Sequence, residues 1–333
     1  MAKRIVNIIA LLLVFISLLM TFSFGCSDKG RQSGDSKPPT EEQLPPEEQI
    51  PPSEPPPAEE EPPIEELPEE KPPVKRTVKL TIGSFNICHC ADWSTGENSP
   101  PASPGKTAGL IDQIGYDVVG LQEVYQDGGS NPLLTNQTAL LLRFSKLTYG
   151  VFGLGQRFEW GHSIGNAVIS KYPILSKTII PVPQPTDEEK RPTETQWYED
   201  RVIVKATVRI SNYVNVDFNI DYITTHFGLN PLEQENMVEV LVKLIDGCTN
   251  PVVLCGDFNS DPSNKVQKPL RERLISAADV VGKTNEFTAS SLNPYAPLDY
   301  IFLSKEFRVI SYDVIKEISS DHFPIRAEVE IDV

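Results

Sequence analysis

Apolar and polar residues alternate along many short segments of this chain, and a two-residue period is that of a β-strand with two different faces. Val, Ile, Phe and Tyr dominate these segments. The pattern predicts strands over residues 78–87, 117–124, 165–170, 201–210, 214–227, 251–258, 299–304 and 325–331.

Helices are predicted between these strands, over Lys106–Ile114, Pro132–Phe144, Pro231–Ile245 and Gln267–Leu274. In the third segment, one helix face collects Met237, Val240, Leu241, Leu244 and Ile245. Strands mixed with helices favour a layered α/β fold. The 260 residues of Val74–Val333 are enough for one large domain with a substantial core.

The N-terminus has a different pattern, in which Lys3 and Arg4 precede an apolar run from Ile5 to Phe24. A basic start followed by an apolar run predicts an export signal over residues 1–25. The following Gly25 and Cys26 resemble the lipobox of bacterial lipoproteins, in which the cysteine is acylated. Plain secretion and an uncleaved anchor remain alternatives, and all three place the rest of the chain outside the cytoplasm.

Residues 26–73 are predicted to be a disordered stalk. Within Pro38–Pro73, 14 of 36 residues are Pro and 12 are Glu, so little apolar area is available for burial. We expect the stalk to hold the domain away from the membrane, and an unstructured segment with no role is the alternative.

The net charge of the domain limits the classes of partner that it can bind. The chain has 46 acidic and 30 basic residues, of which 14 and 6 lie in residues 1–73, so 32 and 24 remain for the folded part. An acidic domain lacks the broad basic surface expected of a protein that grips nucleic acid through its phosphates.

The cysteines of the domain give a weak metal signal. Cys88 and Cys90 would share one strand face if the first strand continued over them, and no second pair has zinc-type spacing. Cys248 and Cys255 could form a disulfide outside the cytoplasm. We expect buried free thiols instead.

Polar side chains recur at the ends of the predicted strands, where layered α/β proteins place ligand sites. They are Asn86, Glu123, His226, Asp257, Asn259, Asp299, Asp321 and His322. The carboxylates and amides are hard oxygen donors that suit Mg²⁺ or Mn²⁺ rather than zinc. With imidazoles beside them, they indicate attack of a metal-activated water on phosphorus.

Eight motifs, in this order, resemble the endonuclease/exonuclease/phosphatase superfamily over about residues 78–331. They are SFN, DVVGLQEV, GNAVISKYPI, EDRVIVKATV, TTHFGLN, VVLCGDFNSDP, LDYIFLS and SSDHFPI. The resemblance implies a four-layered αββα sandwich, with two mixed β-sheets packed face to face and helices outside. It also implies cleavage of phosphate esters with Mg²⁺.

The resemblance assigns roles by position. Glu123 is implied as the principal metal ligand, with Asn86 close by and Asp321 as a further carboxylate on the metal side. Asp257 is implied to position or deprotonate the attacking water, and Asn259 to orient the phosphate and that carboxylate.

Histidines complete the implied site. His226 is implied to contact the phosphate, and Asp299 to pair with His322, which acts as a base or as an electrostatic stabiliser. Arg201 matches a recurrent arginine, with an ion pair bracing two strands as its alternative. His162 is a candidate on the substrate side.

The expected function is that of a surface-tethered, Mg²⁺-dependent phosphodiesterase or phosphatase, acting as a monomer. Its substrate would be a lipid head group, an inositol phosphate or nucleic acid, and an extracellular nuclease is the main alternative. A surface binding module without turnover is a further alternative. The insert at residues 182–200, with Trp197 and Tyr198, is a candidate substrate loop.

Overall fold

The computed structural model describes residues 76–159, 161–195, 197–212 and 216–333. The predicted export signal, Cys26 and the whole predicted stalk therefore lie outside the described residues. In the described part of the chain, no helix is long and apolar enough to cross a membrane.

The first sheet has six strands in the order β11-β12-β1-β2-β4-β3. Their bounds are β1 Thr77–Asn86, β2 Val118–Gly128, β3 Tyr149–Arg157, β4 His162–Ser170, β11 Phe307–Val314 and β12 Ile325–Asp332. β1 and β2 are parallel, whereas β1 pairs with β12 in antiparallel register, so the sheet is mixed.

The second sheet also has six strands, in the order β5-β6-β7-β8-β10-β9. Their bounds are β5 Ile174–Val182, β6 Arg201–Asn212, β7 Val216–His226, β8 Val252–Asp257, β9 Ile275–Ser276 and β10 Asp299–Leu303. β7 and β8 are parallel, and β8 and β10 are antiparallel, so this sheet is mixed as well.

The two sheets pack face to face through one apolar core. Leu80 and Ile325 of the first sheet share this core with Val204 and Val253 of the second. The hydroxyl of buried Tyr222 on β7 donates to the Gly83 carbonyl on β1, at 2.6 Å, and therefore joins the sheets at their interface.

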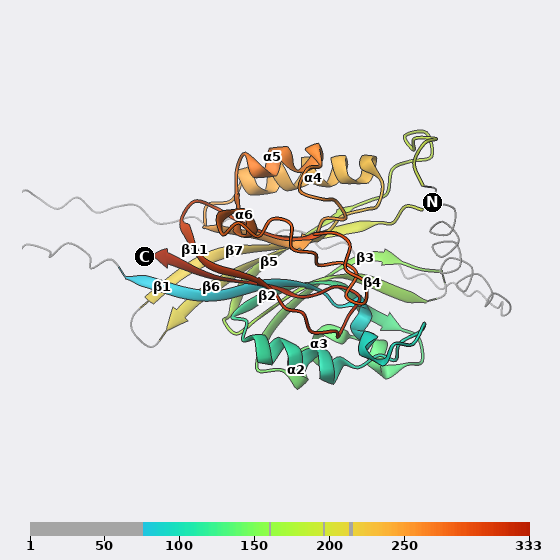
Figure 1. Cartoon of the computed structure of the whole chain (residues 1–333), viewed down its shortest axis with the longest axis horizontal. Coiled ribbons are helices and arrows are strands. Elements are labelled where there is room, and N and C mark those ends of the chain that lie inside the picture. The colour runs from blue at the N-terminus through green and yellow to red at the C-terminus, as the bar shows by residue number, and fades with distance from the viewer. Residues whose placement is uncertain (1–75, 160, 196, 213–215) are drawn as a thin grey trace, which may run out of the picture. The chain divides into compact units, whose positions relative to one another are not determined.

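Helices cover the outer faces of both sheets (Figure 1). Their bounds are α2 Pro104–Ile114, α3 Gln137–Phe144, α4 Pro231–Asp246, α5 Lys268–Arg271 and α6 Ala277–Val280. α2 and α3 pack on the first sheet through a core that includes Ile111 and Leu141. α4 packs on the second through Met237 and Leu241. The predicted four-layered α/β sandwich is confirmed.

Two predicted helices are shorter than expected. The segment Pro132–Phe144 divides into a 3-10 turn, Pro132–Leu134, and α3, because Asn136 adopts a left-handed backbone (φ 47°) and caps α3 by accepting from Ala139 N–H. The segment Gln267–Leu274 keeps only the four-residue α5, after a 3-10 turn over Lys265–Gln267.

The first strand ends at Asn86 and does not continue over Cys88 and Cys90, so the condition for the two to share a strand face is not met. Residues 88–90 form a 3-10 turn in which Cys88, His89 and Cys90 all have left-handed φ, at 42°, 46° and 61°. The described cysteines are all free. The expected buried thiols are found for Cys88, Cys90 and Cys255, while Cys248 is partly exposed.

Candidate active site

Strand register brings the polar strand ends together. In the second sheet, Asp257 at the end of β8 lies opposite His226 of β7 on one side and Asp299 of β10 on the other. In the first sheet, Asn86 at the end of β1 lies opposite Gln122 of β2, which places Glu123 next to it. The same edge of both sheets therefore carries the site.

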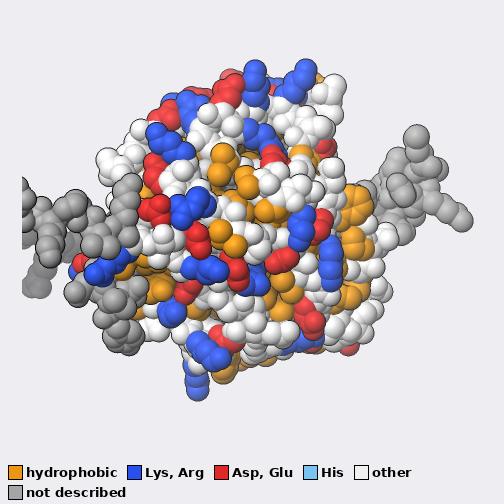
Figure 2. All heavy atoms as spheres, turned by 60° about the vertical axis from the view of Figure 1, so that its left-hand side comes forward, with side chains coloured by type: hydrophobic (Ala, Val, Ile, Leu, Met, Phe, Trp, Pro, Cys, Tyr) orange, Lys and Arg blue, Asp and Glu red, His pale blue; other side chains and the backbone are white. Residues whose placement is uncertain are grey.

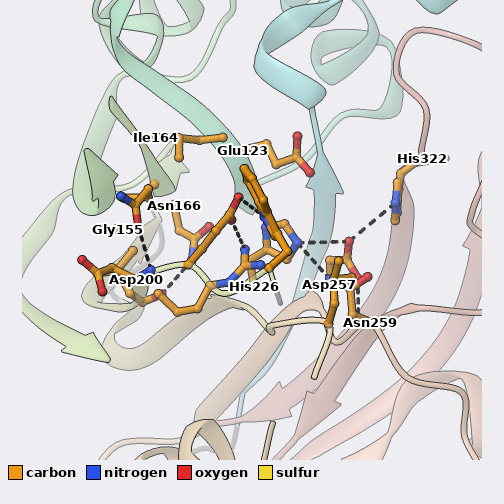
Figure 3. Close-up of a pocket in the computed structure, with 16 residues that line it drawn as sticks. Glu123, Gly155, Ile164, Asn166, Asp200, His226, Asp257, Asn259 and His322 are labelled. Carbon is orange, nitrogen blue, oxygen red and sulfur yellow. Dashed lines mark hydrogen bonds and ion pairs between the residues drawn. The ribbon is translucent and has the colours of Figure 1, made fainter. Parts of the chain in front are cut away.

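Asp257 is the centre of a polar network in this site (Figure 3). Its Oδ2 accepts from Asn86 Nδ2 at 3.1 Å and lies 3.5 Å from His322 Nε2 and 3.6 Å from His226 Nε2. Its Oδ1 accepts from the backbone N–H of Asn259 at 2.9 Å. One carboxylate thus connects four of the predicted site residues.

His322 is held by the distant Asp299 rather than by its chain neighbour Asp321. Its Nδ1 lies 2.8 Å from Asp299 Oδ2, the pairing expected from the sequence. Burial alone would lower the pKa of His322, but the carboxylates of Asp299 and Asp257 hold it well above its ordinary value. These carboxylates therefore favour the protonated, cationic form of the ring.

His226 has the opposite character. Burial lowers its pKa well below the ordinary value, and the cations Arg201 and His322 act in the same direction. Asn259 Nδ2 lies 3.1 Å from His226 Nε2 and also donates to the Phe227 carbonyl at 2.9 Å. The site thus pairs one neutral and one cationic imidazole around Asp257, whose pKa burial raises to about 6.

Glu123 and Asp321 meet beside this network. Burial and the Asp321 carboxylate raise the pKa of Glu123 to about 7. Asn86 Nδ2 donates to Glu123 Oε1 at 3.0 Å, while its amide oxygen accepts from Cys88 N–H at 3.1 Å. Two crowded carboxylates that repel each other fit a divalent cation, because its charge would relieve that repulsion.

Within the described residues, two groups bring three possible metal-binding atoms within 4.8 Å of one another: Asp257 with Asp299 and His322, and Glu123 with Cys88 and His89. Asn86 bridges the carboxylates of Glu123 and Asp257 through its amide nitrogen and does not turn its oxygen toward them. In this structure Asn86 therefore connects the two carboxylates by hydrogen bonds.

A pocket of about 230 Å³ opens beside the network. The predicted site residues in its wall are Glu123, Arg201, His226, Asp257, Asn259 and His322. The sequence analysis did not single out Gly155, Gln156, Ile164, Gly165, Asn166, Glu199, Asp200, Val202 and Leu229, which also line it. Asn166 belongs to the quoted GNAVISKYPI motif. Gln156 lies on β3, a strand that the hydrophobic pattern did not predict.

The insert at residues 182–200 contributes Trp197 to this wall. The indole N–H of Trp197 donates to Glu199 Oε1 at 3.0 Å, and Arg201 Nη1 lies 3.2 Å from Glu199 Oε2. Arg201 therefore lines the pocket and pairs with a residue only two positions before it in the chain. This ion pair does not connect two strands. His162 is not part of this wall and contacts Tyr125 edge-on, at 5.5 Å between ring centroids.

Fold and site together define an α/β-sandwich hydrolase of phosphate esters. The sequence matches the model of the Endonuclease/Exonuclease/phosphatase family over residues 83–322. The chain belongs to this family, whose members are phosphoesterases that generally use a divalent metal. A comparison with curated protein sequences finds no match.

Solved structures share the fold. An endonuclease/exonuclease/phosphatase from Beutenbergia cavernae is 20% identical, with a TM-score of 0.60, covering 76% of this chain and 72% of that one. A mannosyl-6-phosphatase from Bacteroides thetaiotaomicron is 16% identical (TM-score 0.54; 75% and 99% covered). The catalytic domain of human Nocturnin is 19% identical (TM-score 0.52; 77% and 97% covered).

Proposed function

We propose that this protein is a Mg²⁺-dependent phosphoesterase that uses Asp257 to direct water onto the phosphorus of a small phosphate ester. The observation that supports it most directly is the contact of one buried carboxylate with Asn86, His226, His322 and Asn259 in a pocket wall. Mn²⁺ is the alternative metal, since it accepts the same hard donors.

The charge and hydrogen-bonding capacity of each side chain suggest its role in the reaction. With a pKa of about 6, Asp257 is largely anionic at neutral pH and can hold and deprotonate a water molecule. Cationic His322 stabilises negative charge on the phosphate, and Asn259 hydrogen-bonds a phosphate oxygen. Glu123 and Asp321 would hold the metal, which supplies Lewis-acid stabilisation of phosphate oxygens when bound.

The surroundings of the pocket favour a small ester over a nucleic acid. Asp200 and Glu199 line it beside Trp197. Arg201 pairs with Glu199, so this part of the wall keeps a net negative charge that repels a polyanion. Away from the pocket, the face in Figure 2 also mixes Lys and Arg side chains with Asp and Glu and shows no broad basic surface. Lipid head groups, inositol phosphates and sugar phosphates are the substrate classes that fit.

A substrate panel tests this function. The full chain would be assayed with Mg²⁺ or Mn²⁺ on bis-p-nitrophenyl phosphate, sphingomyelin, inositol phosphates, a sugar 6-phosphate and DNA. We expect turnover of a small ester and little turnover of DNA. Preferred cleavage of DNA would support the nuclease alternative, and no metal-dependent turnover of any substrate would refute the enzyme.

We further propose that the protein is exported and anchored through acylated Cys26, with residues 26–73 as a stalk. The basic start, the apolar run and the Gly25–Cys26 pair support this proposal. Labelled palmitate should enter the wild-type protein and not the Cys26→Ser variant. Equal labelling of both would contradict it.

The pairing of Asp299 with His322 predicts a pH effect. Asp299→Asn removes a carboxylate that keeps His322 protonated, so His322 loses its proton at lower pH. If cationic His322 is required, the alkaline limb of the kcat/KM profile moves to lower pH. An unchanged alkaline limb would contradict the cationic role. If instead only the acid limb moved to lower pH, His322 would act as the base.

A further inference from the structure

The turn after β1 places a thiol and an imidazole next to Glu123. The thiol of Cys88, an imidazole nitrogen of His89 and a carboxylate oxygen of Glu123 lie within 4.8 Å of one another. This group is distinct from the oxygen donors expected for Mg²⁺, because two of its three atoms are sulfur and nitrogen. It shares Glu123 with the site described above.

The backbone turns these side chains toward the site. Cys88 and His89 both have left-handed φ, an uncommon conformation for residues other than Gly, Asn and Asp. The Cys88 N–H is fixed by the amide oxygen of Asn86, at 3.1 Å. The arrangement therefore follows from backbone that is itself tied to the active site.

Neighbouring side chains hold the donors in place. The His89 ring stacks on Tyr125, with 4.8 Å between centroids and 20° between planes. The Asp321 carboxylate interacts electrostatically with the buried thiol of Cys88 and raises the pKa of that thiol. By contrast, Cys90 packs into the apolar core with Ile111 and contributes nothing to this group.

Thiolate, imidazole and carboxylate are together the donor types of zinc sites, and catalytic zinc commonly has three protein ligands. We propose that Cys88, His89 and Glu123 form a second metal site, for a thiophilic divalent cation of the Zn²⁺ class. Binding releases the thiol proton, so the ion is bound by the thiolate. The site competes with, or adjoins, the Mg²⁺ site through their common carboxylate.

Cobalt is a suitable probe, because bound Co²⁺ reports a thiolate ligand by a charge-transfer absorption band in the near ultraviolet. The full chain would be stripped with a chelator and titrated with Co²⁺ alone. We expect the band in the wild type and its loss on addition of Zn²⁺. The band should be absent in Cys88→Ser. It should be retained in Cys248→Ser, because the thiol of Cys248 in the wild type contacts the Leu244 carbonyl and lies outside the proposed site.

A second measurement tests whether the imidazole of His89 is a metal ligand. Zn²⁺ affinity, measured by chelator competition, should fall at least about tenfold in His89→Ala. It should stay near wild type in His162→Ala, since His162 lies against the same Tyr125 but outside the donor group. Circular dichroism establishes that each variant is folded before it is compared.

The proposal would be overturned by the absence of a charge-transfer band in the wild type, or by a band that persists in Cys88→Ser. Equal Zn²⁺ affinity of wild type, His89→Ala and Glu123→Gln would do so as well. These readouts require no turnover. A protein that binds Zn²⁺ here but hydrolyses no phosphate ester would refute the proposed function and leave the metal site standing.

Discussion

Replacing Asp257 with Asn is expected to lower kcat by about 10²- to 10⁴-fold, the usual contribution of a positioned acid–base group. The amide keeps the shape of the side chain but cannot take a proton from water. It also loses its charge interaction with cationic His322, whose Nε2 lies 3.5 Å from Asp257 Oδ2. Steady-state kinetics on the best substrate of the panel measures the effect.

Asp221→Asn is the matched control. Asp221 is likewise buried, but it lies in the middle of β7, where it accepts from Thr207 at 2.7 Å and pairs with Lys205 at 3.3 Å. Its replacement should lower stability, by about 1–3 kcal/mol, and leave kcat nearly unchanged. Equal loss of stability and activity in both variants would mean that Asp257 has a structural role instead.

Replacing Glu123 with Gln is expected to weaken the binding of the activating metal. Glu123 is a carboxylate whose pKa is raised to about 7 by burial and by Asp321, so a bound cation stabilises it strongly. Without that charge, the Mg²⁺ concentration for half-maximal activity should rise by about 10- to 100-fold or more. Chelation should inactivate the wild type, and added Mg²⁺ should restore it.

Glu233→Gln provides the comparison for this variant. Glu233 is a buried glutamate in the capping box of α4, where it accepts from the N–H of Asn230. Its replacement should lower the unfolding temperature without changing the Mg²⁺ requirement. A Mg²⁺ requirement that is the same in Glu123→Gln and the wild type would exclude Glu123 as a metal ligand.

The central strands could be predicted from the sequence because they are buried and keep a regular pattern. The strands that the pattern did not predict are β3, β5, β9 and β11, and these are the four edges of the two sheets. On β5 several apolar side chains face solvent, with Leu175 54% exposed. A strand covered on fewer sides has less need of alternation, so its sequence carries a weaker signal.

The active site could likewise be predicted only in part. Asp257, His226 and Asp299 could be grouped from their strand ends, because register then brings them together. The pairing of Cys88 with His89 could not, since nothing in the sequence indicates that the backbone becomes left-handed after Asn86. If the CxC pattern is interpreted as a strand, the partner of Cys88 on the same face is Cys90. The turn instead places Cys90 in the core.

The hydrogen bond from Asn86 to Asp257 joins a residue of the first sheet to a residue of the second. The active site is therefore complete only when the two halves of the sandwich are docked. A ligand held by groups from both halves binds the folded state alone and stabilises it by mass action, in proportion to the logarithm of its concentration. Substrate and metal thus act as cross-links between the halves, and conditions that loosen the sandwich should weaken binding before they unfold the chain.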